Sequence, residues 1–301
     1  MAQGYRLLDK STIVRAIKTV SGRLQRPAFR LLASTAPGLA EAWAVKLFGT
    51  PRRARREPPA NPPGVPAVPL AVVSGGYRLS AWSWGEGPTV LLVHGWEGHA
   101  GQMSRYVAPL LAHGYRTVAF DLPAHGRSSG RRATVLDLVA AIADVARAVG
   151  PLHGVVAHSL GGTATALAIA GGLASERVVL LAPAAEPTPF VIGLAAHLGL
   201  SAQRADGMLR RVQAMLGGDM AAVNVPHLAT RLRAPLFLVH DPADRQVPWE
   251  HGKAIAEAWP GTQFRSAPGL GHHRVLSDPG VIAEAVGFII GKPQAVPVKS
   301  L

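Results

Sequence analysis

Cysteine is absent from this sequence of 301 residues. Its absence excludes disulfides, thiolate metal sites and a cysteine nucleophile, and it fits the reducing cytoplasm, where we expect the protein to act. Charged residues are also few, at 16%, whereas hydrophobic residues make up 48%. This balance excludes wholesale disorder and allows a sizeable core, and α/β folds of this length often form one unit.

The sequence also lacks long apolar runs and is poor in acidic side chains. No uninterrupted apolar run approaches the ~20 residues that cross a bilayer, and charges recur where a secretory signal needs an apolar segment. Lysine and arginine number 31 against 18 acids. Nine of the thirteen net positive charges fall in residues 1–60, so the basic character belongs mainly to the N-terminal segment.

A helical face is expected in this segment over residues 11–26. Its apolar side chains recur at helical spacing: Ile13, Ile17, Val20 and Leu24. Pro27 is expected to interrupt the helix, and a second helix is expected over about 38–48. A basic amphipathic helix of this kind can dock on its own domain, which we favour, or make weak peripheral contact with an anionic membrane.

Residues 50–69 hold four arginines within five residues, followed by a proline-rich run. Such a run forms neither a helix nor a central strand, so we expect a linker here. Arginine clusters also bind nucleic acid, but interleaved aromatic residues and a recognisable binding motif are missing from this stretch. We therefore expect no nucleic-acid partner.

From about residue 70 onward, strand-like and helix-like segments alternate. The expected strands cover residues 77–85, 89–96, 115–123, 152–159, 177–183, 235–242 and 262–268. The expected helices cover about 99–114, 134–150, 160–172, 249–259 and 279–290. The first of the central strands, "TVLLVHGW", is almost wholly apolar, as expected of a strand covered on both faces. This alternation predicts an α/β fold with a mostly parallel, doubly wound sheet.

The interval 184–232 breaks the alternation, because about fifty residues separate two strands there. It contains helical patterns and is expected to form a small helical cap beyond the carboxyl ends of the strands. The expected organisation is as follows: a basic helical extension with a proline-rich linker at 1–69, a core at 70–183 and 233–292, the cap at 184–232, and a C-terminal tail at 293–301.

Ser159 falls at an abrupt strand-to-helix junction in "VVAHSLGG". A serine in this position can simply cap the helix, or it can be a nucleophile held on a tight turn. A serine nucleophile needs a base to take its proton, and the base needs a third group to orient it. A carboxylate and a histidine at the ends of later strands therefore favour the second interpretation.

The carboxylate is found in "HDPADRQVP" and the histidine in "GLGHH". Asp241 precedes a proline and suits a turn, whereas Asp244 lies farther into the loop, so Asp244 is favoured as the partner of a histidine. His272 is favoured over its neighbour His273, because it follows a glycine-rich turn that can bring an imidazole close to the serine.

From about residue 70 to 290 the chain resembles the α/β-hydrolase superfamily. Five motifs carry the resemblance in the right order: "LLVHGW", "FDLPAHGRS", "AHSLGG", "HDPADRQVP" and "GLGHH". It implies a catalytic triad of Ser159, His272 and Asp244, and an oxyanion hole that includes the backbone N–H of Trp96. The backbone N–H of Leu160, at the helix N-terminus, is the other expected donor.

One position departs from the family pattern, because Ala157 stands where the usual Gly-x-Ser-x-Gly elbow has its first glycine. A methyl group there predicts a slightly altered turn. The side chain of His158 is expected to face away from the nucleophile, where it either shapes the pocket or packs under the cap. Trp96 either walls an acyl pocket or simply packs.

The other histidines have no expected catalytic role. His94 and His125 resemble loop-shaping residues of the family, and Asp121 and Ser128 are expected to hold the second of these loops by hydrogen bonds. The remaining histidines lack metal-ligand spacing, and neither a dinucleotide nor a Walker motif is present. We therefore expect no metal and no cofactor.

The resulting prediction is a serine hydrolase that cleaves a small carboxylic ester through an acyl-enzyme. The same fold can also act on thioesters, lactones, amides or carbon–carbon bonds, or carry out perhydrolysis, because the cap and pocket determine the substrate. A binding protein with an idle pocket is the alternative from a different class. No oligomeric state follows from the sequence.

Overall fold

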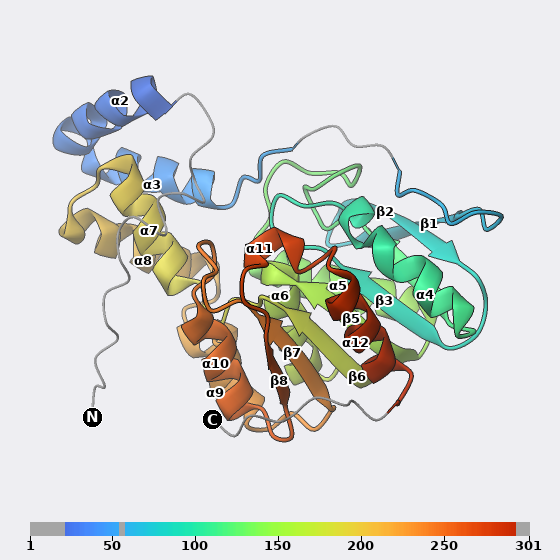
Figure 1. The fold of residues 1–301 in the computed structure, drawn as a ribbon. Coiled ribbons are helices and arrows are strands. Elements are labelled where there is room, and N and C mark those ends of the chain that lie inside the picture. Colours follow the sequence, from blue (N-terminus) through green and yellow to red (C-terminus); the bar gives the residue numbers. More distant parts are fainter. Residues whose placement is uncertain (1–21, 54–57, 293–301) are drawn as a thin grey trace.

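A mostly parallel sheet forms the centre of the molecule in the computed structural model, which describes residues 22–53 and 58–292 (Figure 1). Its eight strands lie in the order β1-β2-β4-β3-β5-β6-β7-β8. They are β1 (Val68–Ser74), β2 (Tyr77–Trp84), β3 (Thr89–Val93), β4 (Arg116–Phe120), β5 (Leu152–His158), β6 (Ser175–Leu181), β7 (Leu236–His240) and β8 (Gln263–Ser266). Only the β1–β2 and β2–β4 pairs are antiparallel, so the expected doubly wound α/β sheet is confirmed.

The central strands are rich in buried apolar residues because both faces of the sheet are covered. All five residues of β3 are buried, and the four apolar ones alternate between two cores. Helices α5 (Val135–Val149), α6 (Ser159–Ala170), α9 (Val225–Ala229) and α10 (Trp249–Ala258) contribute to the first core. The 3₁₀ helix η1 (Ala100–Tyr106) and helices α4 (Val107–Ala112) and α12 (Pro279–Ile289) contribute to the second. Burial on both faces is what a parallel sheet requires.

Local sequence signals fix the ends of α5. The Thr134 side chain accepts a hydrogen bond from Asp137 N, and the Asp137 carboxylate accepts one from Thr134 N, which forms a capping box. Gly150 follows the helix with a φ of +89°, a conformation that glycine adopts without strain. These signals place the helix within the range expected from the sequence.

A group of four helices stands beside the sheet, on the side where α11 (Gly271–Arg274) lies (Figure 1). Two of them, α7 (Thr188–Leu198) and α8 (Ala202–Met215), come from the interval expected to be a cap. The other two, α2 (Gly22–Thr35) and α3 (Pro37–Phe48), come from the N-terminal extension. The last part of the interval 184–232 does not join this group of helices. There η2 (Met220–Val223) leads into α9, which packs against α6 and α10 over the sheet.

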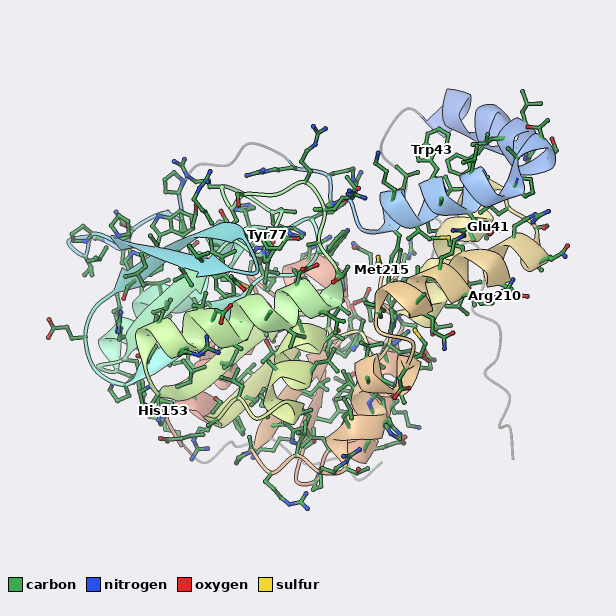
Figure 2. All side chains as sticks on the ribbon, turned by 180° about the vertical axis from the view of Figure 1, so that it is seen from behind. Glu41, Trp43, Tyr77, His153, Arg210 and Met215 are labelled. Atoms are coloured by element: carbon green, nitrogen blue, oxygen red, sulfur yellow. The ribbon has the colours of Figure 1, made fainter. Side chains whose placement is uncertain are left out.

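Charge and close packing hold the N-terminal helices on α8. The carboxylate of Glu41 lies 3.4 Å from Arg204 and 3.3 Å from Arg211, and the Glu41 residue is buried. A β-carbon at Gly207 would lie 2.5 Å from Glu41 Oε1, so the glycine permits this approach. Figure 2 shows Glu41 between α3 and α8, and Trp43, which stacks on Phe29, between α3 and α2.

Several details differ from the sequence expectations. Pro27 does not interrupt α2, which runs through it, because a proline in a helix removes one backbone hydrogen bond without always ending the helix. The proline-rich stretch was expected to be a linker up to residue 69, but β1 begins at Val68. Pro69 is tolerated there because β1 is an edge strand. The helix expected over 99–114 begins as the 3₁₀ helix η1.

Two expectations fall on parts of the chain that the structure does not fully describe. The helical face expected over residues 11–26 lies outside the described residues except for its last five positions. The expected tail at 293–301 lies wholly outside them. Across residues 22–53 and 58–292, no helix combines the length and apolar character needed to cross a membrane.

Candidate active site

Ser159 occupies the sharp turn from β5 into α6. Its φ is +51°, in the left-handed region that a residue with a side chain rarely adopts. Such a conformation costs on the order of 1–3 kcal/mol and persists only where the surrounding structure imposes it. The extended residue that caps α6 is His158, not Ser159. Ser159 is therefore not the helix-capping serine that the sequence alone allowed.

Two glycines allow neighbouring backbone to approach Ser159. A β-carbon at Gly95 would lie only 2.8 Å from Ser159 Cβ, so the loop after β3 passes directly against the serine. A β-carbon at Gly161 would lie 2.1 Å from the carbonyl oxygen of His94, so the first turn of α6 packs on the same loop. Side chains at either position would push the loop and the serine apart.

His272 connects Ser159 to Asp244. Its Nε2 lies 3.0 Å from Ser159 Oγ, and its Nδ1 lies 2.8 Å from Asp244 Oδ2. Because an ionised carboxylate can only accept, Nδ1 carries the hydrogen and Nε2 accepts from the serine hydroxyl. All three residues are buried. The structure thus brings together three residues that follow β5, β7 and β8 and that are far apart in the sequence.

Asp244 is held by more than His272. Its Oδ1 accepts hydrogen bonds from Gln246 N at 2.7 Å and Val247 N at 3.1 Å. The Nε2 of His240, which donates to Val247 O, lies 3.5 Å from Asp244 Oδ2. Burial on its own raises the pKa of Asp244, but hydrogen bonds from His240, His272 and Gln246 N–H outweigh it and hold the pKa well below its usual range. The carboxylate is therefore ionised beside His272.

Asp241 and His273 lie outside this arrangement. Asp241 accepts hydrogen bonds from Ala243 N and from Gly271 N, so it holds the turn that carries His272. The His273 side chain is exposed, and its ring packs against the rings of His158 and His272. The geometry places Asp244 and His272, and not these two neighbours, next to each other.

His158 lies beneath His272 and does not form a pocket wall. It is 2% exposed, its Nε2 donates to the backbone carbonyl of His272 at 2.9 Å, and the two rings are 4.7 Å apart. Burial, with a smaller effect from His272, holds the pKa of His158 well below its usual value, so the ring is neutral. The structure gives this side chain a supporting position in place of a pocket-shaping one.

The loop after β3 carries Trp96 and is fixed by His94. The His94 Nε2 accepts from Leu122 N at 3.0 Å, and its Nδ1 lies 2.7 Å from Gly95 O. The Trp96 ring packs edge-on against the ring of His125, with centroids 4.8 Å apart. On the other side of Ser159, Leu160 N–H lies in the first turn of α6, where backbone donors lack partners within the helix.

The loop after β4 is held as expected from the sequence. Asp121 accepts hydrogen bonds from Ala100 N and Arg127 N, both at 2.8 Å. The Ser128 hydroxyl donates to the backbone carbonyl of Asp121. Burial raises the pKa of Asp121, and these backbone donors oppose the shift. The expected hydrogen bonds of Asp121 and Ser128 are confirmed.

Two cavities open on the surface, and one of them borders His272. One of about 310 Å³ opens beside His272, and its lining includes Arg245, Gln246 and Arg274. A larger one of about 550 Å³ lies between α3 and the start of α5, and its lining includes Tyr77, Asp137 and Met215. The smaller cavity borders His272 on the side of Asp241 and Gly271, and the lining of neither cavity includes Ser159. Over the described part of the chain, no group of three metal-binding side chains is found.

Sequence reasoning missed two contacts at this site. One is the position of His240 next to Asp244, although His240 was visible as the last residue of a strand that leads into the carboxylate loop. The other is an ion pair between Arg52 of the N-terminal extension and Glu97, which directly follows Trp96. No sequence signal links residues that lie 45 positions apart in this way.

The chain is similar to known proteins in both sequence and fold. A model of the alpha/beta hydrolase family matches residues 90–285. A monoacylglycerol lipase from Mycolicibacterium smegmatis is 26% identical over 251 residues, which cover 68% of this chain and 89% of the lipase. A serine hydrolase-like protein from Danio rerio is 36% identical over 98 residues, covering 31% of this chain and 30% of that protein.

Solved structures are similar in fold. An esterase from Pyrococcus furiosus superimposes with a TM-score of 0.61 at 20% identity, covering 80% of this chain and 97% of the esterase. An esterase from Rhodococcus superimposes with a TM-score of 0.57 at 21% identity, covering 75% of this chain and 99% of that one. At these identities the likeness concerns the fold alone.

Proposed function

Because the chain belongs to the alpha/beta hydrolase family, we propose that it is a serine hydrolase that cleaves carboxylic esters with Ser159, His272 and Asp244. The observation that carries this proposal is the hydrogen-bonded series of these residues, at 3.0 Å and 2.8 Å. A nucleophile, a base and an orienting carboxylate in this order are the parts that acyl transfer needs. The names of the relatives, a monoacylglycerol lipase and several esterases, support an ester as the substrate.

The reaction follows from the geometry in two halves. Ser159 Oγ attacks the ester carbonyl while His272 Nε2 takes the hydroxyl proton, and Asp244 stabilises the imidazolium that forms. The tetrahedral intermediate collapses, the bond to the alcohol breaks, and His272 returns the proton to the leaving oxygen. Water then attacks the acyl-enzyme with His272 as base, and the carboxylic acid leaves as Ser159 regains its proton.

The developing negative charge on the carbonyl oxygen needs donors that are already in place. We assign this role to the backbone N–H groups of Trp96 and Leu160. Two observations support the assignment: the loop of Trp96 passes against Ser159 at Gly95, and Leu160 lies at the positive end of the α6 dipole. Helices α7 and α8 serve as the cap in this proposal.

A fluorophosphonate probe and a panel of p-nitrophenyl esters of increasing acyl length test the proposal. We expect the protein to be labelled at Ser159, and we expect Ser159→Ala to lower kcat by about 10⁴-fold or more while the protein stays folded. The matched control is Ser266→Ala, which removes an exposed hydroxyl on an edge strand and keeps full activity. Unchanged turnover in the Ser159→Ala variant contradicts the proposal.

The same panel distinguishes the alternatives. Labelling at Ser159 without ester turnover directs the search to thioesters, lactones, amides or carbon–carbon bonds, which share the acyl-enzyme chemistry. No labelling supports the binding protein with an idle pocket. Cytoplasmic location and weak membrane contact through residues 11–26 stay predictions. Sedimentation with anionic liposomes, with and without residues 1–21, tests the membrane contact.

A further inference from the structure

The part of the N-terminal extension that follows α3 reaches the proposed site, although helices α2 and α3 themselves lie beside α7 and α8. Residues Pro51–Arg53 run across the loops that follow β3 and β4, and Pro51 is buried. These are the loops that carry Trp96 and His125. The arginines at positions 52 and 53 each contact a different one of the two loops.

Arg52 holds the loop after β3 through Glu97. Its Nε lies 2.9 Å from both carboxylate oxygens of Glu97, and its backbone N donates to Oε1 at 3.1 Å. One carboxylate is thus fixed by the side chain and the backbone of the same residue, which restricts its orientation more than a simple ion pair does. Glu97 itself has a φ of +58°, in the left-handed region. Its loop therefore depends on outside contacts to keep this shape.

Arg53 holds the loop after β4 through backbone carbonyls. Its Nε donates to Gly126 O at 2.8 Å, its Nη1 to Gly130 O at 3.2 Å, and its Nη2 to Ser128 O. One planar guanidinium thus connects three carbonyls of the turn that begins at His125. Burial lowers the pKa of His125 to about 4, so the ring that packs on Trp96 is neutral near pH 7.

The two sets of contacts meet at Trp96. Arg52 holds the residue after Trp96, and Arg53 holds the loop whose histidine packs against the Trp96 ring. The backbone just before Trp96 is already pressed against Ser159 at Gly95. A change in this loop therefore changes the distance between Trp96 N–H and an oxygen bound at Ser159.

We propose that Arg52 and Arg53 are positioning residues for ester hydrolysis, which hold the Trp96 loop and the loop after β4 in the geometry that binds the oxyanion. The proposal rests on the function proposed above. It makes the N-terminal extension part of the active enzyme, although neither arginine touches the substrate. Because the negative charge on the carbonyl oxygen develops in the transition state and the tetrahedral intermediate but not in the bound substrate, loss of this geometry lowers kcat and leaves KM almost unchanged.

The test compares Arg52→Ala with Arg211→Ala in the full chain. Both remove a half-exposed arginine that pairs with a carboxylate, with side-chain exposures of 42% and 47%, but Arg211 pairs with Glu41 beside the cap. We expect Arg52→Ala to lower kcat by about tenfold, less than the ~10²–10³-fold typical of deleting a whole oxyanion donor. KM stays within twofold in Arg52→Ala, and Arg211→Ala keeps kcat. Arg53→Ala behaves like Arg52→Ala, and Arg52→Lys recovers part of kcat.

A second measurement separates this inference from the proposed function. Gly98 N donates to Gly95 O inside the Trp96 loop, so hydrogen exchange of a peptide spanning residues 94–99 reports on the loop without any substrate. We expect faster exchange there in Arg52→Ala but not in Arg211→Ala. Faster exchange in a protein that hydrolyses no ester overturns the function and leaves the loop contact standing.

Three results overturn the inference itself. The first is a kcat in Arg52→Ala and Arg53→Ala within twofold of the parent protein. The second is a rise in KM with kcat unchanged, which indicates a contact to the bound substrate. The third is a fall in melting temperature and kcat that Arg211→Ala reproduces, which indicates a general structural role.

Discussion

His158 donates a hydrogen bond from its Nε2 to the backbone carbonyl of His272, at 2.9 Å. The residue next to the proposed nucleophile thus supports the backbone of the proposed base. Its ring also packs 4.7 Å from that of His272. The hydrogen bond holds the backbone of His272, and the ring contact holds its side chain. Together they limit how far His272 can shift from Ser159.

Replacement of His158 by phenylalanine tests this support. His158→Phe keeps a ring but removes the donor and leaves a buried carbonyl without a partner, at a cost of about 1–3 kcal/mol in the free energy of unfolding. We expect kcat to fall by about tenfold, since small misplacements of reacting groups are costly. His158→Gln, which can still donate, is expected to recover part of both losses. Full activity in His158→Phe, measured with the same ester, contradicts the supporting role.

The core of the site could be predicted because each of its residues lies at or just beyond the carboxyl end of a parallel strand. The carboxyl ends of such strands meet at one edge of the sheet, so "AHSLGG", "HDPADRQVP" and "GLGHH" had to come together there. The central strands were equally visible, because burial on both faces leaves unbroken apolar runs.

Other features had no local pattern that could reveal them. Edge strand β1 contains Pro69 and exposes most of its residues, so its sequence lacks the alternation of apolar and polar residues that would mark a half-buried strand. The contact of Arg52 with Glu97 joins residues that are distant in the sequence. The contact of His158 with His272 joins residues that lie 114 positions apart. Such contacts follow from the assembled fold and not from sequence spacing.

A methyl group at Gly95 is predicted to damage activity more than stability. In Gly95→Ala the new carbon would lie 2.8 Å from Ser159 Cβ and 3.2 Å from His158 O, so the loop must move away from the serine. We expect kcat to fall by about 10²-fold, since the Trp96 N–H moves with this loop. Gly171→Ala is the control, because its methyl makes only ordinary contacts, the nearest at 3.4 Å. An active Gly95→Ala variant shows that the loop does not position a donor.

The stability of the protein is predicted to fall in mild acid. Burial lowers the pKa of His125 and of His251 to about 4, below the value of 6.5 for an exposed histidine. Between these values the unfolded chain binds more protons than the folded one, so stability is fully present above pH 6.5 and is lost as the pH falls toward 4. Each histidine contributes up to about 3 kcal/mol to this loss.

Urea unfolding of His251→Gln at pH 7 and pH 5 measures the contribution of one group. The His251 Nδ1 accepts from Ala185 N, and glutamine can accept in its place without titrating. We expect the loss of stability between the two pH values to shrink in this variant. His113→Gln, at an exposed position, is expected to leave the loss unchanged. An unaltered pH dependence in His251→Gln would falsify the assignment of its lowered pKa.

Ala157 is predicted to be compatible with full activity, although the family elbow usually has glycine there. It is fully buried, and its backbone pairs in register with Val93 and Leu180, while Ser159 two residues later still has a φ of +51°. The methyl therefore does not prevent the strained turn. We expect Ala157→Gly to change kcat by less than about threefold and to cost about 1 kcal/mol of stability, because glycine loses more conformational freedom on folding and leaves a small void. Kinetics with the preferred ester and urea unfolding measure the two effects. A tenfold gain in kcat would mean that the methyl does distort the turn, and that the alanine holds the enzyme below the activity its fold allows.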